Sequence, residues 1–444
     1  MKHTLLKLAV AAAIAALGAS AHADKAPLRY DLKPYAQSAA ARAAQAEAGG
    51  QVIEMAGAPW VRLIFKDVKL QGNAKLRITS LQDGAQQHLD AGNLRHWRNT
   101  SAYFNGSAVR VELLAPKGSK GNRYEIAQVM VGKTDDVQPE SQCGPVDNRV
   151  PSAADNRARL LDVGCTANLM ANGCFITAGH CLSSASLVDV VEFDVPASNA
   201  NGSLNHPPPS KQYVPTANRQ FQNGGTGKDW GVFTVAPNSE TGLTPLQAQG
   251  PGLALATSLP TVGQTVEITG YGVDSGTANQ TQQVHSGPIT SVVPATTRLL
   301  YQADTEGGNS GSAVLQGGNV VAIHTHGGCT TSGGANSGTL YTNTAFQAGF
   351  ATVCGSGAPE PTCDDVVKIS GKCSAAGKIT ATLTLTDATH DGQSVTMTID
   401  GVPFDVPIDG NKAKLVAPGF TSGNHTLVLA EPASCKPAKT VSCP

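Results

Sequence analysis

Three observations predict that this chain is all-β. Its apolar runs are short and alternate in hydrophobicity, as half-buried strands do. Gly, Pro and Asn separate the runs, and no long amphipathic helix is visible. The 444 residues include 48 glycines but only 15% charged residues, which is typical of a compact, turn-rich protein. A chain of this length is expected to form about two to four domains.

The N-terminal residues have the pattern of an export signal. Lys2 and Lys7 supply positive charge, an alanine-rich apolar run covers 8–17, and Ala21-His22-Ala23 has the small-x-small form of a cleavage site. No later apolar segment approaches the roughly 20 residues that span a bilayer. We therefore expect residues 1–23 to be a signal peptide, and the protein to be exported through the periplasm to the extracellular space.

Residues 24–140 precede the candidate chemistry. The alanine-rich stretch 24–49 has little to pack and is interpreted as a leader. Alternating runs then predict a small antiparallel sandwich over about 51–133, at 60–65, 75–79, 108–113 and 124–131. We interpret this region as a prosegment that aids folding or blocks a cleft, with a permanent binding module as the alternative. The acidic stretch 134–140 is a plausible processing region, where Lys133-Thr134 and Glu140-Ser141 both remain candidate cleavage sites.

Two further units follow. Residues 141–354 have short strand-like runs spaced by turn residues, which favour a β-barrel architecture. A Gly- and Pro-containing linker at 355–362 leads to residues 363–444, whose strict alternation predicts a small immunoglobulin-like sandwich. Four cysteines in that last segment are expected to staple it with two disulfides.

The cysteines agree with export, because oxidising compartments let disulfides persist. None of them forms a Cys-x-x-Cys pair of the kind that binds metal, so no metal or cofactor is expected. The ten cysteines are Cys143, Cys165, Cys174, Cys181, Cys329, Cys354, Cys363, Cys373, Cys435 and Cys443.

A serine between glycines, Ser310 in Gly308-Asn-Ser-Gly311, is the candidate nucleophile. Its hydroxyl would project from a sharp bend, and the N–H groups of Gly308 and Ser310 would hold an oxyanion. An activated serine needs a base, and the base needs a carboxylate to orient it. His180 follows an apolar strand and precedes Cys181. Asp229 enters a buried-looking strand, whereas Asp189, Asp194 and Asp274 lie in polar or turn contexts.

The motifs Thr177-Ala-Gly-His-Cys181, Asp229-Trp-Gly-Val232 and Gly308-Asn-Ser-Gly-Ser312 occur in the order His, Asp, Ser. In this order they resemble the chymotrypsin-fold serine peptidases, nearest the bacterial glutamyl and lysyl endopeptidase branches. The resemblance covers roughly 143–350, and Asp147-Asn-Arg149 resembles the start of the glutamyl branch. The 51–133 region more loosely resembles prosegments of lysyl endopeptidases.

The resemblance implies two six-stranded antiparallel barrels with the active site between them. It makes His180 the general base, Asp229 its orienting carboxylate and Ser310 the acylating nucleophile. It also implies a Cys165–Cys181 disulfide beside the histidine and a Cys143–Cys329 disulfide, with Cys174 and Cys354 left unassigned. Asn309 stands where trypsin-like zymogens have an aspartate, so activation by N-terminal insertion is not expected. Ala313 replaces a usual proline.

Substrate preference stays open at this stage. Asp304 lies six residues before Ser310, where trypsin-like enzymes bind Lys or Arg. His324 falls where the glutamyl branch binds an acidic side chain. Thr325 would then face the triad aspartate, while His326 and Gly327 would line the substrate edge. A solvated cleft edge and a metal site at His324-x-His326-x-x-Cys329 are the alternatives for the two histidines.

The predicted function is a secreted serine endopeptidase that acts on proteins or peptides and is made as a precursor. A formal net charge of −1 argues against nucleic-acid binding. An esterase with the same triad is disfavoured by the order of the residues. A non-catalytic adhesin on a peptidase scaffold is the alternative from another class. The C-terminal sandwich is left with two open roles, in surface binding or in secretion.

Overall fold

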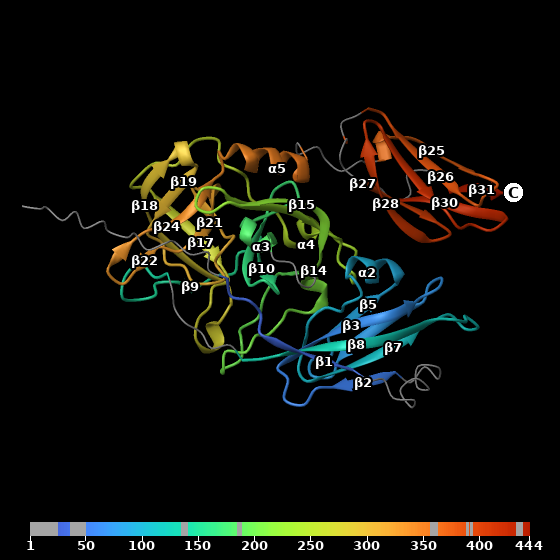
Figure 1. Cartoon of the computed structure of the whole chain (residues 1–444), viewed down its shortest axis with the longest axis horizontal. Helices are drawn as coiled ribbons and strands as arrows, with labels where there is room; N and C mark the ends of the chain where they lie inside the picture. The colour runs from blue at the N-terminus through green and yellow to red at the C-terminus, as the bar shows by residue number, and fades with distance from the viewer. Residues whose placement is uncertain are drawn as a thin grey trace, which may run out of the picture.

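The computed structural model describes residues 25–35, 50–134, 141–183, 189–355, 363–387, 390, 394–431 and 438–444. The predicted signal peptide, most of the leader and Glu140 lie outside these residues. Three β-rich regions follow one another along the chain (Figure 1). Within the described part, no helix is both long and apolar enough to cross a bilayer.

The first region consists of two facing four-stranded sheets, ordered β1-β8-β3-β6 and β2-β7-β4-β5. Alternating burial along the strands follows the predicted pattern, because one side of each strand faces a shared core. The predicted runs fall within β3, β4, β7 and β8. The elements are β1 (Tyr30–Pro34), β2 (Gln51–Glu54), β3 (Trp60–Lys69), β4 (Lys75–Ser80), β5 (Gln86–Leu89), α2 (Ala91–His96), β6 (Phe104–Asn105), β7 (Ala108–Leu114) and β8 (Arg123–Gly132).

The second region begins with a seven-stranded antiparallel sheet, ordered β14-β13-β10-β11-β12-β16-β15. Its central strands are buried along their whole length, because both of their faces are covered. The elements are β10 (Arg157–Leu161), β11 (Cys165–Leu169), β12 (Phe175–Thr177), α3 (Gly179–Ser183), β13 (Val190–Glu192), η1 (Pro209–Lys211), β14 (Gln212–Tyr213), β15 (Pro215–Asn223), β16 (Asp229–Val235) and α4 (Pro245–Gln249).

The second half of this region is a closed barrel. Six strands run in the order β17-β20-β21-β24-β19-β18, and β18 pairs with β17 to close the ring. The short strand β9 (Val150–Pro151) extends β18. The elements are β17 (Thr265–Gly270), η2 (Gly276–Ala278), β18 (Gln283–Val293), η3 (Pro294–Thr296), β19 (Arg298–Tyr301), β20 (Ala313–Gln316), β21 (Asn319–His326), β22 (Cys329–Thr330), β23 (Gly333–Gly334) and β24 (Asn336–Leu340).

The all-β class is therefore confirmed, with one difference in detail. Of the two implied barrels, the second is closed, but the first is an open half-barrel, since its end strands β14 and β15 do not pair within the described residues. Helix α5 (Thr344–Cys354) returns from the second half to pack on the first. There the ring of Trp230 meets that of Phe346 at 6.0 Å, edge to face, and a disulfide joins Cys174 to Cys354.

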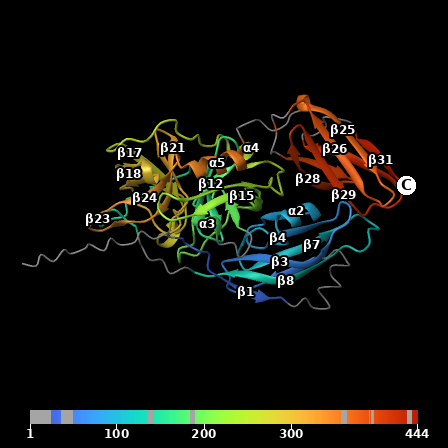
Figure 2. The ribbon, with the colours of Figure 1, turned by 45° about the horizontal axis from the view of Figure 1, so that its top comes forward.

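The third region is a seven-stranded antiparallel arrangement, ordered β25-β26-β29-β28-β27-β30-β31. Burial alternates strictly along β26, as the sequence predicted, and a disulfide joins Cys373 to Cys443. Figure 2 shows this region beside α2 of the first, where Arg95 Nη2 donates to the Pro403 carbonyl at 3.3 Å. The elements are η4 (Cys363–Asp365), β25 (Val366–Cys373), β26 (Ile379–Leu385), β27 (Ser394–Ile399), β28 (Val402–Asp409), β29 (Lys412–Ala417), β30 (Gly423–Glu431) and β31 (Lys439–Cys443).

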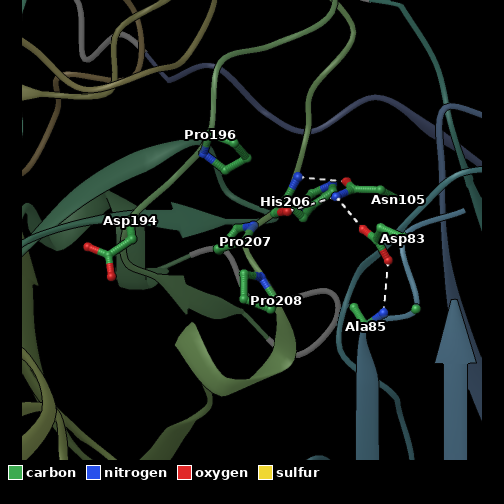
Figure 3. A pocket seen from close by; sticks show the side chains of 9 residues that line it. Asp83, Ala85, Asn105, Asp194, Pro196, His206, Pro207 and Pro208 are labelled. Atoms are coloured by element: carbon green, nitrogen blue, oxygen red, sulfur yellow. Dashed lines mark hydrogen bonds between the residues drawn. The ribbon is translucent and has the colours of Figure 1, made fainter.

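The first region packs directly on the half-barrel. The Tyr103 N–H donates to Gln212 Oε1 and Gln212 Nε2 donates to the Tyr103 carbonyl, each at 2.9 Å. Asn105 pairs with the backbone of His206 in the same reciprocal way. A cavity of about 430 Å³ opens at this contact (Figure 3), and none of the predicted site residues lines it. The cavity therefore belongs to the contact between the two regions.

Candidate active site

His180 stands at the start of α3, immediately after β12 ends. Its Nδ1 lies 2.6 Å from Asp229 Oδ2, and its backbone N–H donates to Asp229 Oδ1 at 3.0 Å. The pairing of β12 with β16 brings Asp229 to this position, since Thr177 is opposite Gly231. Two contacts to one buried carboxylate fix the orientation of the imidazole ring.

The other ring nitrogen of His180 has no such partner. His180 Nε2 is buried, and no described residue forms a hydrogen bond with it. The contact with Asp229 places the proton on Nδ1, so Nε2 is the nitrogen with a free lone pair. This is the atom that a general base would use.

Ser310 lies in the tight turn between β19 and β20. Its carbonyl accepts the Thr166 N–H at 2.8 Å, and Cys181 Sγ lies 3.8 Å from the same oxygen. These contacts bring the serine beside the neighbour of His180, across 129 positions of the chain. A disulfide joins Cys165 to Cys181 and ties this corner of β11 to α3, in the pairing that the resemblance implied.

Gly308 has the conformation that the turn requires. Its φ of 102° lies in the left-handed region, and a Cβ there would approach the Tyr271 carbonyl at 2.5 Å. Asn309 Oδ1 accepts the Glu306 N–H at 3.1 Å, so the amide that replaces the zymogen aspartate stabilises the turn itself. The nearby guanidinium group of Arg149 forms an ion pair with Asp147, with Nη2 2.6 Å from Oδ2.

Asp304 is fully buried and holds the start of the domain. Its Oδ1 accepts the Cys143 N–H at 2.7 Å, and its Oδ2 accepts the backbone and side-chain N–H groups of Asn148 at 2.8 and 2.9 Å. A disulfide between Cys143 and Cys329 secures the same segment. The carboxylate therefore already has three donors from its own chain.

His324 lies in the buried part of β21. Its Nδ1 is 2.6 Å from the hydroxyl of Tyr301 on β19. Burial lowers the pKa of His324 to about 3, and the neighbouring His326 and His180 add to this shift. The ring is consequently neutral at physiological pH. Nothing in the sequence pointed to Tyr301, because the pairing of β19 with β24 and of β24 with β21 brings it here.

The remaining predicted residues lie at the end of β21. Thr325 Oγ1 donates to the Ser337 carbonyl at 3.4 Å and lies 2.9 Å from His326 Nδ1. The sequence analysis expected Thr325 to face Asp229, and neither of these two bonds involves that carboxylate. Asp229 instead donates its backbone N–H to Thr339 Oγ1 at 3.2 Å, a residue that the sequence analysis missed.

The ring of His326 lies near that of His180. The ring centroids of His326 and His180 are 6.3 Å apart with an interplanar angle of 66°, and Gly327 follows directly after the strand.

Three possible metal-ligand atoms meet at this corner, from Cys165, His180 and Cys181. Both sulfurs belong to the disulfide, so neither can supply a thiolate. His180 Nδ1 is occupied by Asp229. The described residues of the cluster are therefore accounted for by the disulfide and the His–Asp pair.

Known proteins with related sequences were found over this region. The model of the Trypsin family matches residues 147–348. A glutamyl endopeptidase from Bacillus licheniformis is 29% identical over 199 residues, which make up 41% of this chain and 57% of that protein. The chain thus matches little more than half the length of this relative.

Solved structures of peptidases also match. A Glu endopeptidase in complex with MPD is 24% identical with a TM-score of 0.37, over 46% of this chain and 96% of that one. The protease Anisep from Arthrobacter nicotinovorans is 17% identical with a TM-score of 0.37, over 47% of this chain and 99% of that one. The stretch that the Trypsin family model matches, residues 147–348, contains the half-barrel, the closed barrel and the three motifs in the order His, Asp, Ser.

Proposed function

We propose that this chain is a secreted serine endopeptidase in which His180, Asp229 and Ser310 form the catalytic triad. The single observation that carries the proposal is the buried His180–Asp229 pair, which leaves Nε2 of the imidazole without a partner beside the serine turn. The contacts of the Ser310 carbonyl with Thr166 and Cys181 support the same arrangement.

The proposed reaction proceeds through an acyl-enzyme. Ser310 Oγ attacks the peptide carbonyl while its proton passes to His180 Nε2, and Asp229 stabilises the imidazolium. The N–H groups of Gly308 and Ser310 hold the oxyanion. The C–N bond then breaks as Nε2–H protonates the leaving amine. Water deacylates the serine by the same route, with His180 acting first as base and then as acid.

We further propose that the enzyme cleaves after glutamate. The contacts of Asp304 argue against a preference for Lys or Arg. Its carboxylate already accepts three hydrogen bonds from its own chain, so it is poorly suited to bind a basic substrate side chain. The hydrogen bond of His324 with Tyr301 also supports a preference for glutamate, because it determines which ring nitrogen carries the proton. If the Tyr301 hydroxyl donates to Nδ1, the neutral ring carries its proton on Nε2, where it can donate to a carboxylate.

Export and precursor processing complete the proposal. The N-terminal signal pattern and the three disulfides of the peptidase region support an oxidising, extracellular destination. The position of the first β-region ahead of the peptidase supports its role as a prosegment. A preference for glutamate makes Glu140-Ser141 the favoured processing site of the two that the sequence offers.

A serine-directed fluorophosphonate tests the enzymatic proposal. The processed chain should form a covalent adduct that maps to Ser310, and the Ser310→Ala protein, prepared identically, should form none. Absence of an adduct on the processed, folded wild-type chain would overturn the proposal. An adduct that forms without any peptide hydrolysis, but with rapid ester hydrolysis, would favour an esterase instead.

Profiling on a peptide library tests the specificity. Glutamate is expected before the cleaved bond. His324→Leu should lower kcat/KM for glutamate substrates by about 10- to 100-fold, because leucine has no N–H and the buried substrate carboxylate loses its donor. Tyr301→Phe keeps the ring and removes only the hydroxyl, so a smaller loss is expected. A preference for Lys or Arg that disappears in Asp304→Asn would contradict this assignment.

A further inference from the structure

The segment Lys25–Leu28 lies in extended form along an edge of the peptidase region. The Ala26 N–H donates to the Gly164 carbonyl, and the Leu28 N–H donates to the Asp162 carbonyl, each at 2.9 Å. From Ala26 to Leu28 the donor moves two residues forward along the chain, while the acceptor moves two residues back. This is the hydrogen-bond pattern of an antiparallel strand pair. Ala26 and Leu28 are buried, whereas Pro27 between them is exposed.

The contact between this segment and the edge at 162–164 is close. Gly164 has a φ of 69°, and a Cβ on it would overlap the carbonyl group of Ala26. Only glycine therefore lets the segment approach this far. Pro27, which has no N–H to offer, occupies the one position that donates no bond to the edge. The residue types on both sides match the contact.

The edge at 162–164 adjoins the catalytic residues. Gly164 precedes Cys165, which is bridged to the neighbour of His180. A Cβ on Gly308 would lie 3.3 Å from the Ala26 Cβ, so Ala26 rests against the glycine assigned to the oxyanion hole. Burial lowers the pKa of Lys25, and the charges of Asp229 and Asp189 oppose that shift.

Two different elements are available to bind the two parts of a substrate that reacts with Ser310. Strand β21, with His324 and His326, belongs to the closed barrel, whereas the edge at 162–164 connects β10 to β11 of the half-barrel. A substrate whose acyl part pairs with β21 must extend its leaving part across the serine toward the half-barrel. The segment Lys25–Leu28 is hydrogen-bonded to that edge of the half-barrel.

We propose that Lys25–Leu28 is an intramolecular inhibitor that occupies the leaving-group side of the cleft until the first β-region is released. This proposal rests on the proposed peptidase function. It adds that the edge at 162–164 is a substrate-binding surface and that Lys25–Leu28 occupies it before processing. Release of the segment would uncover the carbonyls of Gly164 and Asp162, which then accept the N–H groups of an extended protein substrate.

The segment is held in place by the fold that follows it. Strand β1 begins at Tyr30 and pairs with β8 along its whole length, from Tyr30 opposite Gly132 to Pro34 opposite Gln128. The Tyr30 hydroxyl also donates to Asp162 Oδ2 at 3.3 Å. Because the segment is tethered to a docked domain, its effective concentration at the cleft is high, and a few hydrogen bonds suffice to keep it there. Cleavage after the first β-region removes this advantage.

The test measures fluorophosphonate labelling of the intact, unprocessed chain, expressed from Asp24 and followed as the full-length band. A double variant, Ala26→Pro with Leu28→Pro, removes both donors. Its labelling rate at Ser310 should rise by about 10-fold or more over that of the intact wild type. Pro27→Ala is the matched control, since it removes no bond, and its rate should change by less than about 3-fold.

A second variant guards against misfolding of the first. A chain that begins at Arg29 lacks the segment but keeps β1 and the whole first β-region, and it should show the same increase. If the processed wild type labels rapidly while both variants label no faster than the intact wild type, the inhibitor proposal is overturned and the peptidase proposal stands. If no form is labelled at Ser310, both proposals fall.

Discussion

The phenol ring of Tyr103 is stacked on the imidazole of His206, with centroids 4.5 Å apart and planes inclined by 8°. Tyr103 belongs to the first β-region and His206 to the half-barrel, so the stack joins the two. Trp60 meets both rings edge to face, at 5.3 and 5.2 Å. One hydrophobic core runs through this contact and includes Leu161, Val190, Leu204, Val214 and Ala236 of the peptidase region.

Tyr103→Ala should destabilise the unprocessed chain by about 3–5 kcal/mol, the usual cost of removing a buried aromatic ring. Urea denaturation in the inactive Ser310→Ala background measures this without self-cleavage. Tyr103→Phe is the control: it keeps the stack and loses only the bond from Arg62 Nη1, at 3.2 Å, so the loss should be nearer 1 kcal/mol. Equal stability of Tyr103→Ala and wild type would show that the contact contributes nothing.

Acid should weaken the same contact. Burial lowers the pKa of His206 below its ordinary value of 6.5; Arg159 and Arg62 add to the shift, and Glu192, 2.8 Å away, opposes it. Burial also opposes the ionisation of Glu192, yet His206 and Arg159 hold its pKa below the ordinary value. The unfolded chain therefore binds protons that the native chain does not, and stability must fall as the pH drops below about 6.5.

His206→Gln isolates the histidine in this pH dependence. Urea midpoints of the full chain at several pH values between 7 and 5 measure it. On acidification, the free energy of unfolding of the variant should fall less steeply than that of the wild type, by up to about 1.4 kcal/mol per pH unit. The reason is that the variant lacks the proton that His206 binds in the unfolded state but not in the native state. Other groups titrate in both proteins and cancel in the comparison. Parallel pH profiles would contradict the assignment.

Removal of triad members should abolish hydrolysis of a glutamate peptide. We expect Ser310→Ala and His180→Ala to lower kcat by about 10⁴- to 10⁶-fold, and Asp229→Asn by about 10⁴-fold, because the imidazole loses the partner that sets its tautomer. Asp194→Asn is the control, since this carboxylate is paired with Lys211 at 2.6 Å. Near-normal turnover in any of the three triad variants would refute the triad.

The Cys174–Cys354 disulfide should stabilise the packing of α5 on the half-barrel. It closes a loop of 180 positions. Replacing both cysteines with alanine should lower the stability of the chain by about 2–5 kcal/mol, measured as a lower Tm and urea midpoint. The corresponding change at Cys373 and Cys443 is the control: it should weaken the C-terminal region and leave peptidase activity unchanged. An unaltered Tm in the Cys174–Cys354 variant would contradict this role.

Much of the site is encoded in short stretches of sequence. The serine turn, the strand that ends before His180 and the strand that begins at Asp229 each need only a few neighbouring residues to be recognised. The same holds for alternating strands such as β4 and β26, because the two-residue period is a local property of the chain. The resemblance also named both cysteine pairs that flank the site.

What the tertiary structure decided depends on contacts between distant segments. The role of Asp304, the pairing of Tyr301 with His324, the contact of Asp229 with Thr339 and the docking of Lys25–Leu28 each join residues that no local pattern connects. The half-barrel is likewise open because its edge strands β14 and β15, among the described residues, do not pair with each other. The sequence by itself determined the all-β class and the three catalytic candidates, since local periodicity and turn chemistry encode them. Only the folded chain decided which buried polar groups are already satisfied and which edge of the half-barrel binds Lys25–Leu28, because strand register and packing set those distances.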